Sequence, residues 1–499
     1  MGEIPMAQKS LLIIAALLVA AAVVVAAVAM PRGTSQDPQD PYSWWAAPAV
    51  PPMGAFDVVG PRGNNYDDPA DGIYVSPSGD DQTADGSISR PYRSINTALG
   101  AAERGDTIVL RGGVYKEGRD VRIQVSDITI KSAKGELAVI DLTTFDPGRG
   151  EDSAIEFYAE DRDGDPVSNC LLQAVEVMGG YYAVNFETKW EWGQKDRRGA
   201  HDIIIEDCVL HDSKNDVVKV KPGCDNITIR YNEIYNSGRE HVSNPDFIKG
   251  ECNSEGIDNV NGDNMKVQNN YIHDICSNAV YAKGGAVDSL IENNHIERAY
   301  GAGIMVGFDT SPQYFDTSVN PWYYENIGGV VRNNLIIHTG WEGIGLYGSM
   351  YAQIYNNTLV DVNYAQNYHS AIYFGLTYQD WESYAKRPAN VSPDIHHNIV
   401  SQPATFTQRP MVEIRQSSDL GGMSALSGNP TMSENCYYID SKTAGFVDMR
   451  SAGTVPNMGL AQWKAHIGGD DGSIEADPGL NASYKPTNPL CAGMGCNLP

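Results

Sequence analysis

The sequence predicts an all-β protein built as a parallel β-helix, a solenoid whose successive coils stack their strands into long sheets. Three observations predict this fold class. Short apolar segments recur with Asn or Asp at one position, the copies are spaced by about 24 or about 40 residues, and 50 glycines accompany a charged fraction of 20%. Glycine and asparagine tolerate the positive φ angles of tight turns between short strands, so this composition argues against a helical bundle.

Residues 1–30 form a candidate export segment. An uninterrupted apolar run follows Lys9 and contains the small-residue sequence Ala27-Val28-Ala29. Such a run is typical of a signal peptide, and a length of about 20 residues also suits an uncleaved membrane anchor. We therefore expect a secreted or extracytoplasmic protein that meets a membrane only through this segment.

The folded domain is expected to begin after a linker. Residues 31–71 are rich in Pro, Asp and small residues, a composition with little to bury. In the domain that we place at 72–499, an amphipathic helix is predicted at about 94–103 and a strand at 107–110. Because a stack of coils ends in an exposed apolar surface, the short helix is expected to cap the N-terminal end.

One registered position carries Asn or Asp in seven successive repeats. Its members are Asp207, Asn232, Asn270, Asn294, Asn334, Asn357 and Asn398. We expect each of them to take the left-handed conformation at a bend between two strands and to bond to the next coil through its side chain. The longer spacings imply insertions near 239–254, 309–326 and 378–392. Insertions on one side of a solenoid usually build its binding wall.

A second registered strand follows each of these bends. Its inward positions are Val218, Ile257, Val280, Ile304 and Ile344. Because side chains alternate along a strand, the residues that follow these positions are expected to point outward. One predicted outward row is Lys219, Asp258, Tyr281 and Met305, and the next is Lys221, Val260, Lys283, Gly307 and Tyr347.

Three carboxylates of successive coils are expected to converge on this outward face. Asp216, Glu255 and Asp258 form a candidate site for a hard cation, for which Ca²⁺ is the expected ion. Lys283 follows one coil later. A divalent cation and Lys221 nearby would disfavour its ammonium form, and a lysine in its neutral form can act as a general base. Lys283 is therefore the candidate catalytic residue.

The segment Ser254-Glu255-Gly256-Ile257-Asp258, with Asp216 one coil earlier and Lys283 one coil later, resembles the site of the family 9 polysaccharide lyases. These are right-handed parallel β-helix enzymes that cleave pectate by calcium-assisted β-elimination. The resemblance implies that the carboxylates bind calcium and that Lys283 removes the proton α to a uronate carboxylate. The sequence departs from the family pattern at Ser254, where an Asp is expected.

The resemblance implies a secreted lyase whose partner is an acidic, uronic-acid-containing polysaccharide. The residues expected to bind this substrate are Lys219, Lys221, Arg239, Lys249 and Tyr281. A net charge of −27 argues against a nucleic-acid partner, because phosphate binding needs a broad basic face. We expect the protein to be a monomer.

Two other functions stay open. A glycoside hydrolase of the same fold needs carboxylates on both sides of the glycosidic bond, but the sequence lacks the Gly-His-Gly and Arg-Ile-Lys motifs of polygalacturonases. A non-catalytic surface protein that binds carbohydrate is consistent with the candidate anchor and with the aromatic residues of the insertions. In that case Lys283 is an ordinary surface residue.

If the protein is an enzyme, His241 and His273 are alternative bases to Lys283.

The eight cysteines contain no CxxC pair, which disfavours zinc knuckles and redox motifs. An even count in an exported protein is compatible with disulfides, and Cys491 with Cys496 is the nearest pair in sequence. For Cys208 and Cys276, a buried free thiol in the core is the alternative.

Overall fold

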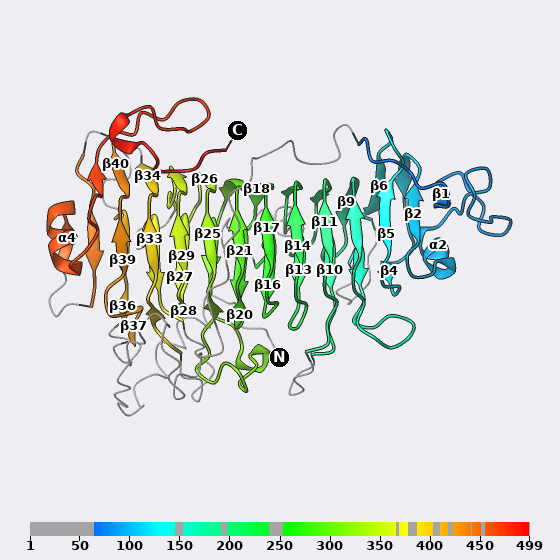
Figure 1. Cartoon of the computed structure of the whole chain (residues 1–499), viewed down its shortest axis with the longest axis horizontal. Coiled ribbons are helices and arrows are strands. Elements are labelled where there is room, and N and C mark those ends of the chain that lie inside the picture. The colour runs from blue at the N-terminus through cyan, green and yellow to red at the C-terminus, as the bar shows by residue number, and fades with distance from the viewer. Residues whose placement is uncertain are drawn as a thin grey trace, which may run out of the picture.

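The structure is a computed structural model that describes residues 64–144, 153–190, 197–238, 253–365, 369–377, 387–402, 410–417, 423–440, 442–450 and 455–498. These residues form a right-handed parallel β-helix, as the sequence predicts. Three sheets of 12 strands each run along the stack, and each full coil contributes one strand to every sheet. In Figure 1 the coils follow one another from the N-terminal end at the right to the C-terminal end at the left.

Sheet 1 is parallel throughout. Its strands are β1 (Ile73–Val75), β2 (Thr107–Leu110), β5 (Thr129–Ser132), β8 (Leu171–Gln173), β11 (Ile204–Glu206), β14 (Thr228–Arg230), β17 (Lys266–Gln268), β21 (Leu290–Glu292), β25 (Val330–Arg332), β29 (Gln353–Tyr355), β33 (Asp394–His396) and β39 (Thr431–Ser433). The strand predicted at 107–110 is β2.

Sheet 2 carries the registered strands singled out in the sequence. Its strands are β4 (Val121–Ile123), β7 (Ile155–Phe157), β10 (Val184–Phe186), β13 (Val218–Val220), β16 (Ile257–Val260), β19 (Val280–Lys283), β23 (Ile304–Val306), β27 (Ile344–Tyr347), β31 (Ile372–Gly375), β35 (Val412–Ile414), β41 (Phe446–Asp448) and β42 (Val455–Met458). Only the last pair, β41 with β42, is antiparallel within the part of this sheet that the structure describes.

Sheet 3 completes each coil. Its strands are β3 (Gly113–Tyr115), β6 (Ala138–Leu142), β9 (Val175–Gly179), β12 (Val209–His211), β15 (Glu233–Tyr235), β18 (Tyr271–Ile275), β22 (His295–Ala299), β26 (Leu335–Ile337), β30 (Thr358–Val360), β34 (Ile399–Gln402), β40 (Cys436–Ile439) and β43 (Ile474–Glu475).

Two small sheets add to the stack. A five-stranded sheet contains β20 (Ala286–Val287), β24 (Asn326–Ile327), β28 (Ser349–Met350), β32 (Asn390–Val391) and β38 (Leu426–Ser427), and a two-stranded sheet contains β36 (Gln416–Ser417) and β37 (Met423–Ser424). The insertion 309–325, which contains the 3-10 helix η1 (Pro312–Tyr314), leaves the stack at the lower edge in Figure 1, where β20 and β28 also lie. The predicted insertions at 239–254 and 378–392 lie largely outside the described residues.

Each end of the stack carries a helix. At the N-terminal end, α2 (Ile95–Ala101) lies where the sequence predicts a helix, and it buries Ile95, Ala98 and Leu99. Its first turn is held by Glu117, which accepts hydrogen bonds from Ile95 N and Ser94 Oγ, both at 2.8 Å. At the other end, α4 (Leu460–Ile467) buries Trp463 against the ring of Phe446, with the ring centroids 5.4 Å apart.

The core confirms the predicted inward row of sheet 2. Its five residues pair in register from coil to coil, and each is 0% exposed. They belong to one apolar cluster that extends from Val75 to Ile467. Burial of this continuous core is the main force that stacks coils which could not fold singly.

The repeated Asn forms a hydrogen-bonded ladder at the bend between sheets 1 and 3. From Asn270 to Asn435, each ladder Oδ1 accepts bonds of 3.0 or 3.1 Å from the backbone N–H and the side-chain amide of the ladder residue one coil earlier, beginning with Asn232. The predicted left-handed conformation is wrong for these residues, because the residue before each of them takes it, as Asn269 does with φ 56°. Asp207, with φ 52°, belongs to this preceding position, and Cys208 N donates to the first ladder amide.

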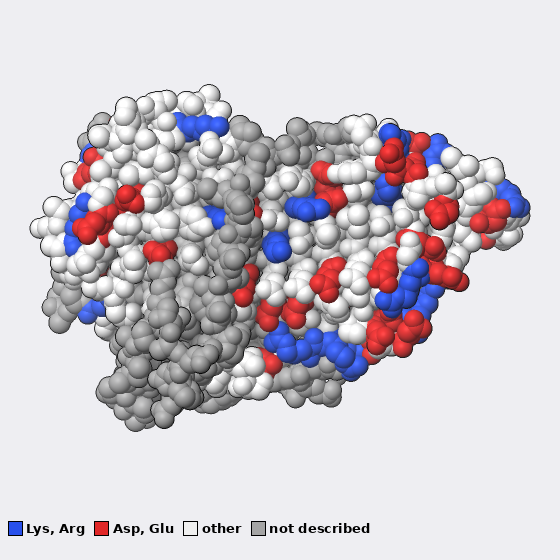
Figure 2. All heavy atoms as spheres, viewed as in Figure 1, with Lys and Arg blue, Asp and Glu red and all other residues white. Residues whose placement is uncertain are grey.

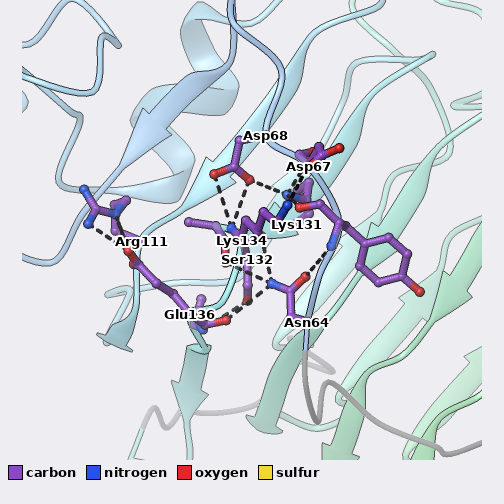
Figure 3. A network of polar contacts seen from close by, with 11 residues as sticks. Asn64, Asp67, Asp68, Arg111, Lys131, Ser132, Lys134 and Glu136 are labelled. Carbon is purple, nitrogen blue, oxygen red and sulfur yellow. Dashed lines mark hydrogen bonds and ion pairs between the residues drawn. The ribbon is translucent and has the colours of Figure 1, made fainter.

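The last part of the predicted linker is docked on sheet 1. Figure 3 shows Asn64, Asp67 and Asp68 facing Lys131 and Lys134. Asn64 Nδ2 donates to Ala133 O at 2.9 Å, and Asp67 pairs with Lys134 at 2.6 Å. Asp68 neutralises Lys131, which is only 3% exposed. Residues 64–71 are therefore part of the folded body, whereas 1–63, including the candidate export segment, lie outside the described residues.

The C-terminal segment returns along sheet 3, at the upper edge in Figure 1, and contains the 3-10 helix η3 (Pro489–Cys491). Cys491 and Cys496 are both free thiols, so the disulfide between them considered from sequence is wrong, and the Sγ atom of Cys491 instead lies 2.9 Å from that of the free Cys436. Cys208 is a buried free thiol, whereas Cys276 is disulfide-bonded. Within the described ranges, no helix is long and apolar enough to cross a membrane.

Candidate functional site

Sheet 2 places the predicted site residues on neighbouring coils. Lys219 of β13 pairs in register with Asp258 of β16, which pairs with Tyr281 of β19, and Val260 pairs with Lys283. The predicted outward rows are therefore confirmed at this point of the sheet. Adjacent strands of a sheet lie about 4.8 Å apart, so side chains of two coils can share one ligand.

The three predicted carboxylates meet. Asp216 and Glu255 lie at the entry to β13 and β16, and Asp258 lies within β16, so that one carboxylate oxygen of each lies within 4.8 Å of the others. All three residues are at most 3% exposed. Asp216 Oδ1 accepts a 2.9 Å hydrogen bond from Glu255 N, which fixes the spacing between the two coils.

Two lysines flank the carboxylate of Asp258. Lys219 Nζ contacts Asp258 Oδ2 and also lies 3.2 Å from Asp216 Oδ2. Lys283 Nζ lies 3.7 Å from Asp258 Oδ1 and 4.2 Å from the centre of the Tyr281 ring. The side chain of Lys283 is 13% exposed, so its amine is held in a mostly buried position.

The pKa values of Glu255 and Asp258 are shifted in opposite directions. Burial and the neighbouring charges of Asp216 and Asp258 raise the pKa of Glu255 well above its usual range. Burial acts in the same direction on Asp258, but Lys219 and Lys283 outweigh it and lower the pKa of Asp258. Removing a carboxylate from water disfavours its charge unless a cation compensates. The two lysines compensate for Asp258, whereas for Glu255 the charge of Lys283 does not outweigh burial and the neighbouring carboxylates.

The donor set fits a hard cation. Glu255 Oε2 and Asp258 Oδ1 are buried oxygens without a hydrogen-bond partner, and a cation with oxygen ligands at flexible geometry uses such atoms. Asp216 Oδ2, by contrast, is engaged by the ammonium group of Lys219. Metal binding would therefore compete with Lys219 for one of the three carboxylates.

The other predicted binding residues have different surroundings. Lys221 Nζ pairs with Glu187 on the preceding coil, and Tyr281 is 3% exposed beneath Lys283. Arg239 and Lys249 lie outside the described residues, as does the alternative base His241. His273 belongs to β18 of sheet 3, where it contacts Glu233 and Asp274, so it is not an alternative base at this site.

Two acidic residues near Lys283 were missed by the sequence reasoning. Glu325 is 0% exposed and accepts hydrogen bonds from Gly284 N at 2.9 Å and Thr310 Oγ1 at 2.6 Å. It thereby ties the insertion 309–325 to the residue that follows Lys283. The second residue is Asp309, where burial raises the pKa to about 7 against the opposing charge of Lys283. Their only sequence signal was their place in a predicted insertion.

Charged side chains are unevenly distributed over the molecule. On the face drawn in Figure 2, Lys and Arg are interspersed with Asp and Glu over the N-terminal half of the stack, whereas the described C-terminal half is mostly uncharged. On this face, basic side chains therefore lie close to acidic ones over the N-terminal half of the stack.

Comparisons with known proteins find similarity over parts of the chain. A family model described as the right handed beta helix region matches residues 194–371. A pectate lyase, PEL9 of Emericella nidulans, is 39% identical over 74 residues, which are 14% of this chain and 18% of that protein. The uncharacterized protein YwoF of Bacillus subtilis is 35% identical over 79 residues, 15% of this chain and 17% of that protein.

The A-module of the mannuronan C-5 epimerase AlgE6 from Azotobacter vinelandii is 12% identical, with a TM-score of 0.49 over 77% of this chain and 94% of that module. The matches to the two curated relatives span less than a fifth of either protein, so they concern a local segment rather than a whole enzyme.

Proposed function

We propose that this protein is a polysaccharide lyase that cleaves a uronic-acid-containing polysaccharide by β-elimination, with Lys283 as the base. One observation carries the proposal: Lys283 Nζ lies 3.7 Å from a carboxylate that belongs to a buried cluster of three, on the outward face of a parallel sheet. The local similarity to a pectate lyase is consistent with it.

The chemistry requires a base for a weakly acidic proton. In a uronate, the carbon α to the carboxylate carries that proton, and the glycosidic oxygen is attached to the next carbon of the ring. The neutral amine of Lys283 would take the proton, the electron pair of the broken C–H bond would form a carbon–carbon double bond, and the glycosidic C–O bond would break. The leaving oxygen then needs a proton from water or an acid.

Asp216, Glu255 and Asp258 would hold a calcium ion in this proposal. When bound, the ion supplies positive charge that pairs with the uronate carboxylate and disfavours a proton on the neighbouring Lys283. The chain itself positions the base, because the ring of Tyr281 lies under the Lys283 amine and Asn278 Nδ2 donates to the Tyr281 hydroxyl at 2.6 Å.

Replacement of Lys283 tests the proposal. The wild-type protein is expected to release an unsaturated product, followed by its ultraviolet absorbance, from at least one of pectate, alginate and an acidic glycosaminoglycan. Lys283→Ala is expected to abolish this release, and Lys283→Arg to do the same because a guanidinium does not give up its proton. The matched control is Lys485→Ala, in the C-terminal segment and away from sheet 2. Undiminished release by Lys283→Ala would reject the proposal.

The same assay separates the alternatives. Release of reducing ends without the unsaturated chromophore would indicate a hydrolase. Binding of polyuronate that survives chelation, with no bond cleavage, would indicate a non-catalytic carbohydrate-binding protein.

A further inference from the structure

The row that carries Asp258 continues along sheet 2 well beyond the candidate site. After Tyr281 and Met305 it runs in register through Gly345 and Tyr373 to Glu413 of β35. Five interstrand steps separate Asp258 from Glu413, a distance of about 24 Å along the sheet. Both carboxylates thus lie on the same outward face.

Glu413 is a largely buried carboxyl group. It is 5% exposed, and it makes no hydrogen bond or ion pair with any residue that the structure describes. Its neighbours in β35, Val412 and Ile414, are 0% exposed and point into the core, so Glu413 points to the outer face. A largely buried polar group without a hydrogen bond from the protein costs free energy. Such a costly arrangement is typical of a site where a ligand supplies the missing partner.

A fixed imidazole accompanies Glu413. His369 Nδ1 contacts Oε2 of Glu342, a fully buried carboxylate whose other oxygen accepts a 2.7 Å hydrogen bond from the Tyr347 hydroxyl. The ring of His369 stacks on Tyr373, with centroids 4.4 Å apart and planes 6° apart. The imidazole is therefore held by Glu342 on one side and by an aromatic face on the other.

Glycines make the room that Tyr347 needs. Its ring lies where a side chain at position 375 would stand, since a β-carbon on Gly375 would come within 1.9 Å of Tyr347 Cε1. At Gly345 the corresponding distance to Tyr347 Cε2 is 2.8 Å. Any side chain at Gly375 would displace Tyr347, which orients Glu342. The position of Tyr347 therefore requires glycine at both 345 and 375.

An unbroken series of rings joins this cluster to Lys283. The centroids of Tyr281 and Phe308 are 5.5 Å apart, and those of Phe308 and Tyr347 are 5.2 Å apart. Tyr347 and Tyr373 follow at 5.8 Å. Half-buried Trp341 ends the series, 5.5 Å from the ring of His369. Tyr281, Tyr347 and Tyr373 are buried, whereas Phe308 and Trp341 are half-buried, so these two rings are the ones suited to contact the apolar face of a sugar ring.

We propose that a second carbohydrate subsite is formed by Trp341, His369, Tyr373, Glu413 and Arg415. It binds one uronate residue of a polysaccharide while another residue of the same polysaccharide lies at Lys283. The ligand class rests on the proposed function. Trp341 would contact the face of the sugar ring, and the carboxyl group of Glu413 would hydrogen-bond its hydroxyls. Arg415, which is half-buried one residue after β35, would pair with the uronate carboxylate through its planar guanidinium.

The charges around Glu413 agree with this assignment. Burial raises the pKa of Glu413 to about 7, while the charges of His369 and Arg415 act in the opposite direction and that of Glu342 in the same one. Near neutral pH the group can therefore donate a hydrogen bond as well as accept one, and a sugar hydroxyl can use both.

The test measures binding and stability together. Calorimetry with uronate oligosaccharides of graded length is carried out on Lys283→Ala, which prevents turnover, and on the same protein with Glu413→Met or Glu413→Gln. Glu413→Met should leave the affinity for the shortest oligomers unchanged. It should weaken the affinity for the longest oligomers by about five-fold to ten-fold, because at least one hydrogen bond is lost. Glu413→Gln should restore part of this loss, since an amide still bonds hydroxyls. Glu103→Met, at an exposed position, is the control.

Stability distinguishes a ligand-binding role from a structural one. Methionine in place of a largely buried carboxyl group without a hydrogen bond from the protein should raise the melting temperature. Equal affinity of Glu413→Met and its parent for the longest oligomers, or a lower melting temperature of Glu413→Met, would overturn the subsite. Failure of the proposed function would instead be seen in product formation, since Lys283→Ala would then still release the unsaturated product or the wild type would release none.

Discussion

Lys283 Nζ lies 3.7 Å from Asp258 Oδ1, although the two residues are 25 positions apart in the chain and one coil apart in the stack. Asp258 also contacts Lys219, so one buried carboxylate forms ion pairs with two ammonium groups. This relationship decides how the site should respond to substitution.

Asp258→Asn should destabilise the fold strongly. The change leaves Lys219, whose side chain is 17% exposed, without its main counter-charge, and breaking a buried ion pair from one side costs about 3–5 kcal/mol. The free energy of unfolding from urea titration measures the loss. The double variant Lys219→Met/Asp258→Asn should recover most of it, because the uncompensated ammonium is gone. A single variant as stable as the wild type would show that Asp258 does not compensate Lys219.

Calcium should stabilise the protein through the three carboxylates. A ligand that binds only the folded state at 100 times its dissociation constant adds about 2.7 kcal/mol of stability. We therefore expect the melting temperature to rise with added calcium and to fall again with a chelator. Glu255→Gln should remove the rise, since Glu255 Oε2 is one of the two buried carboxylate oxygens of this cluster without a hydrogen-bond partner. A rise that persists in Glu255→Gln would place the ion elsewhere.

The two adjacent asparagines Asn269 and Asn270 should differ sharply in their contribution to stability. Asn270 accepts from both groups of Asn232 and donates to Ile229 O and Asn294 Oδ1, so Asn270→Ala leaves buried partners unsatisfied and should cost about 1–3 kcal/mol or more. Asn269 supplies mainly its left-handed conformation, which glycine adopts without strain.

Asn269→Gly is therefore the matched control, with an expected change within about 0.5 kcal/mol in the same urea titration. Similar losses in Asn269→Gly and Asn270→Ala would contradict the division of roles between the bend and the ladder.

His211 should make stability depend on pH in the alkaline range. Burial alone would lower the pKa of His211, but Asp212 and Glu176 outweigh it and raise the pKa from 6.5 to about 9. A raised pKa in the folded state favours folding while the imidazole is charged, so this contribution is full below about pH 6.5 and is lost as the pH rises through about 9.

Replacement of His211 by Gln checks this dependence. The difference in melting temperature between the wild type and His211→Gln should shrink as the pH rises from 6 to 10, by circular dichroism at each pH. A difference that is constant over this range would show that the ring acts through packing on Tyr235 rather than through its charge.

The sequence by itself determined the fold class, the inward and outward rows of sheet 2 and the ladder of asparagines, because a solenoid is built from local repeats. Its side chains alternate with period two, and each coil meets only its neighbours, so aligning the repeats is equivalent to stacking the coils. The convergence of Asp216, Glu255 and Asp258 followed from the same alignment.

Only the tertiary structure decided which side chain engages which. Register placed Lys219 near Asp258, but only the structure showed that it also engages Asp216, where a cation would compete with it. Glu325, Asp309 and the pair of Glu342 with His369 come from irregular segments between strands, which have no repeat to align. There the positions of polar side chains depend on burial and on partners from distant parts of the chain, and these exist only once the coils have stacked.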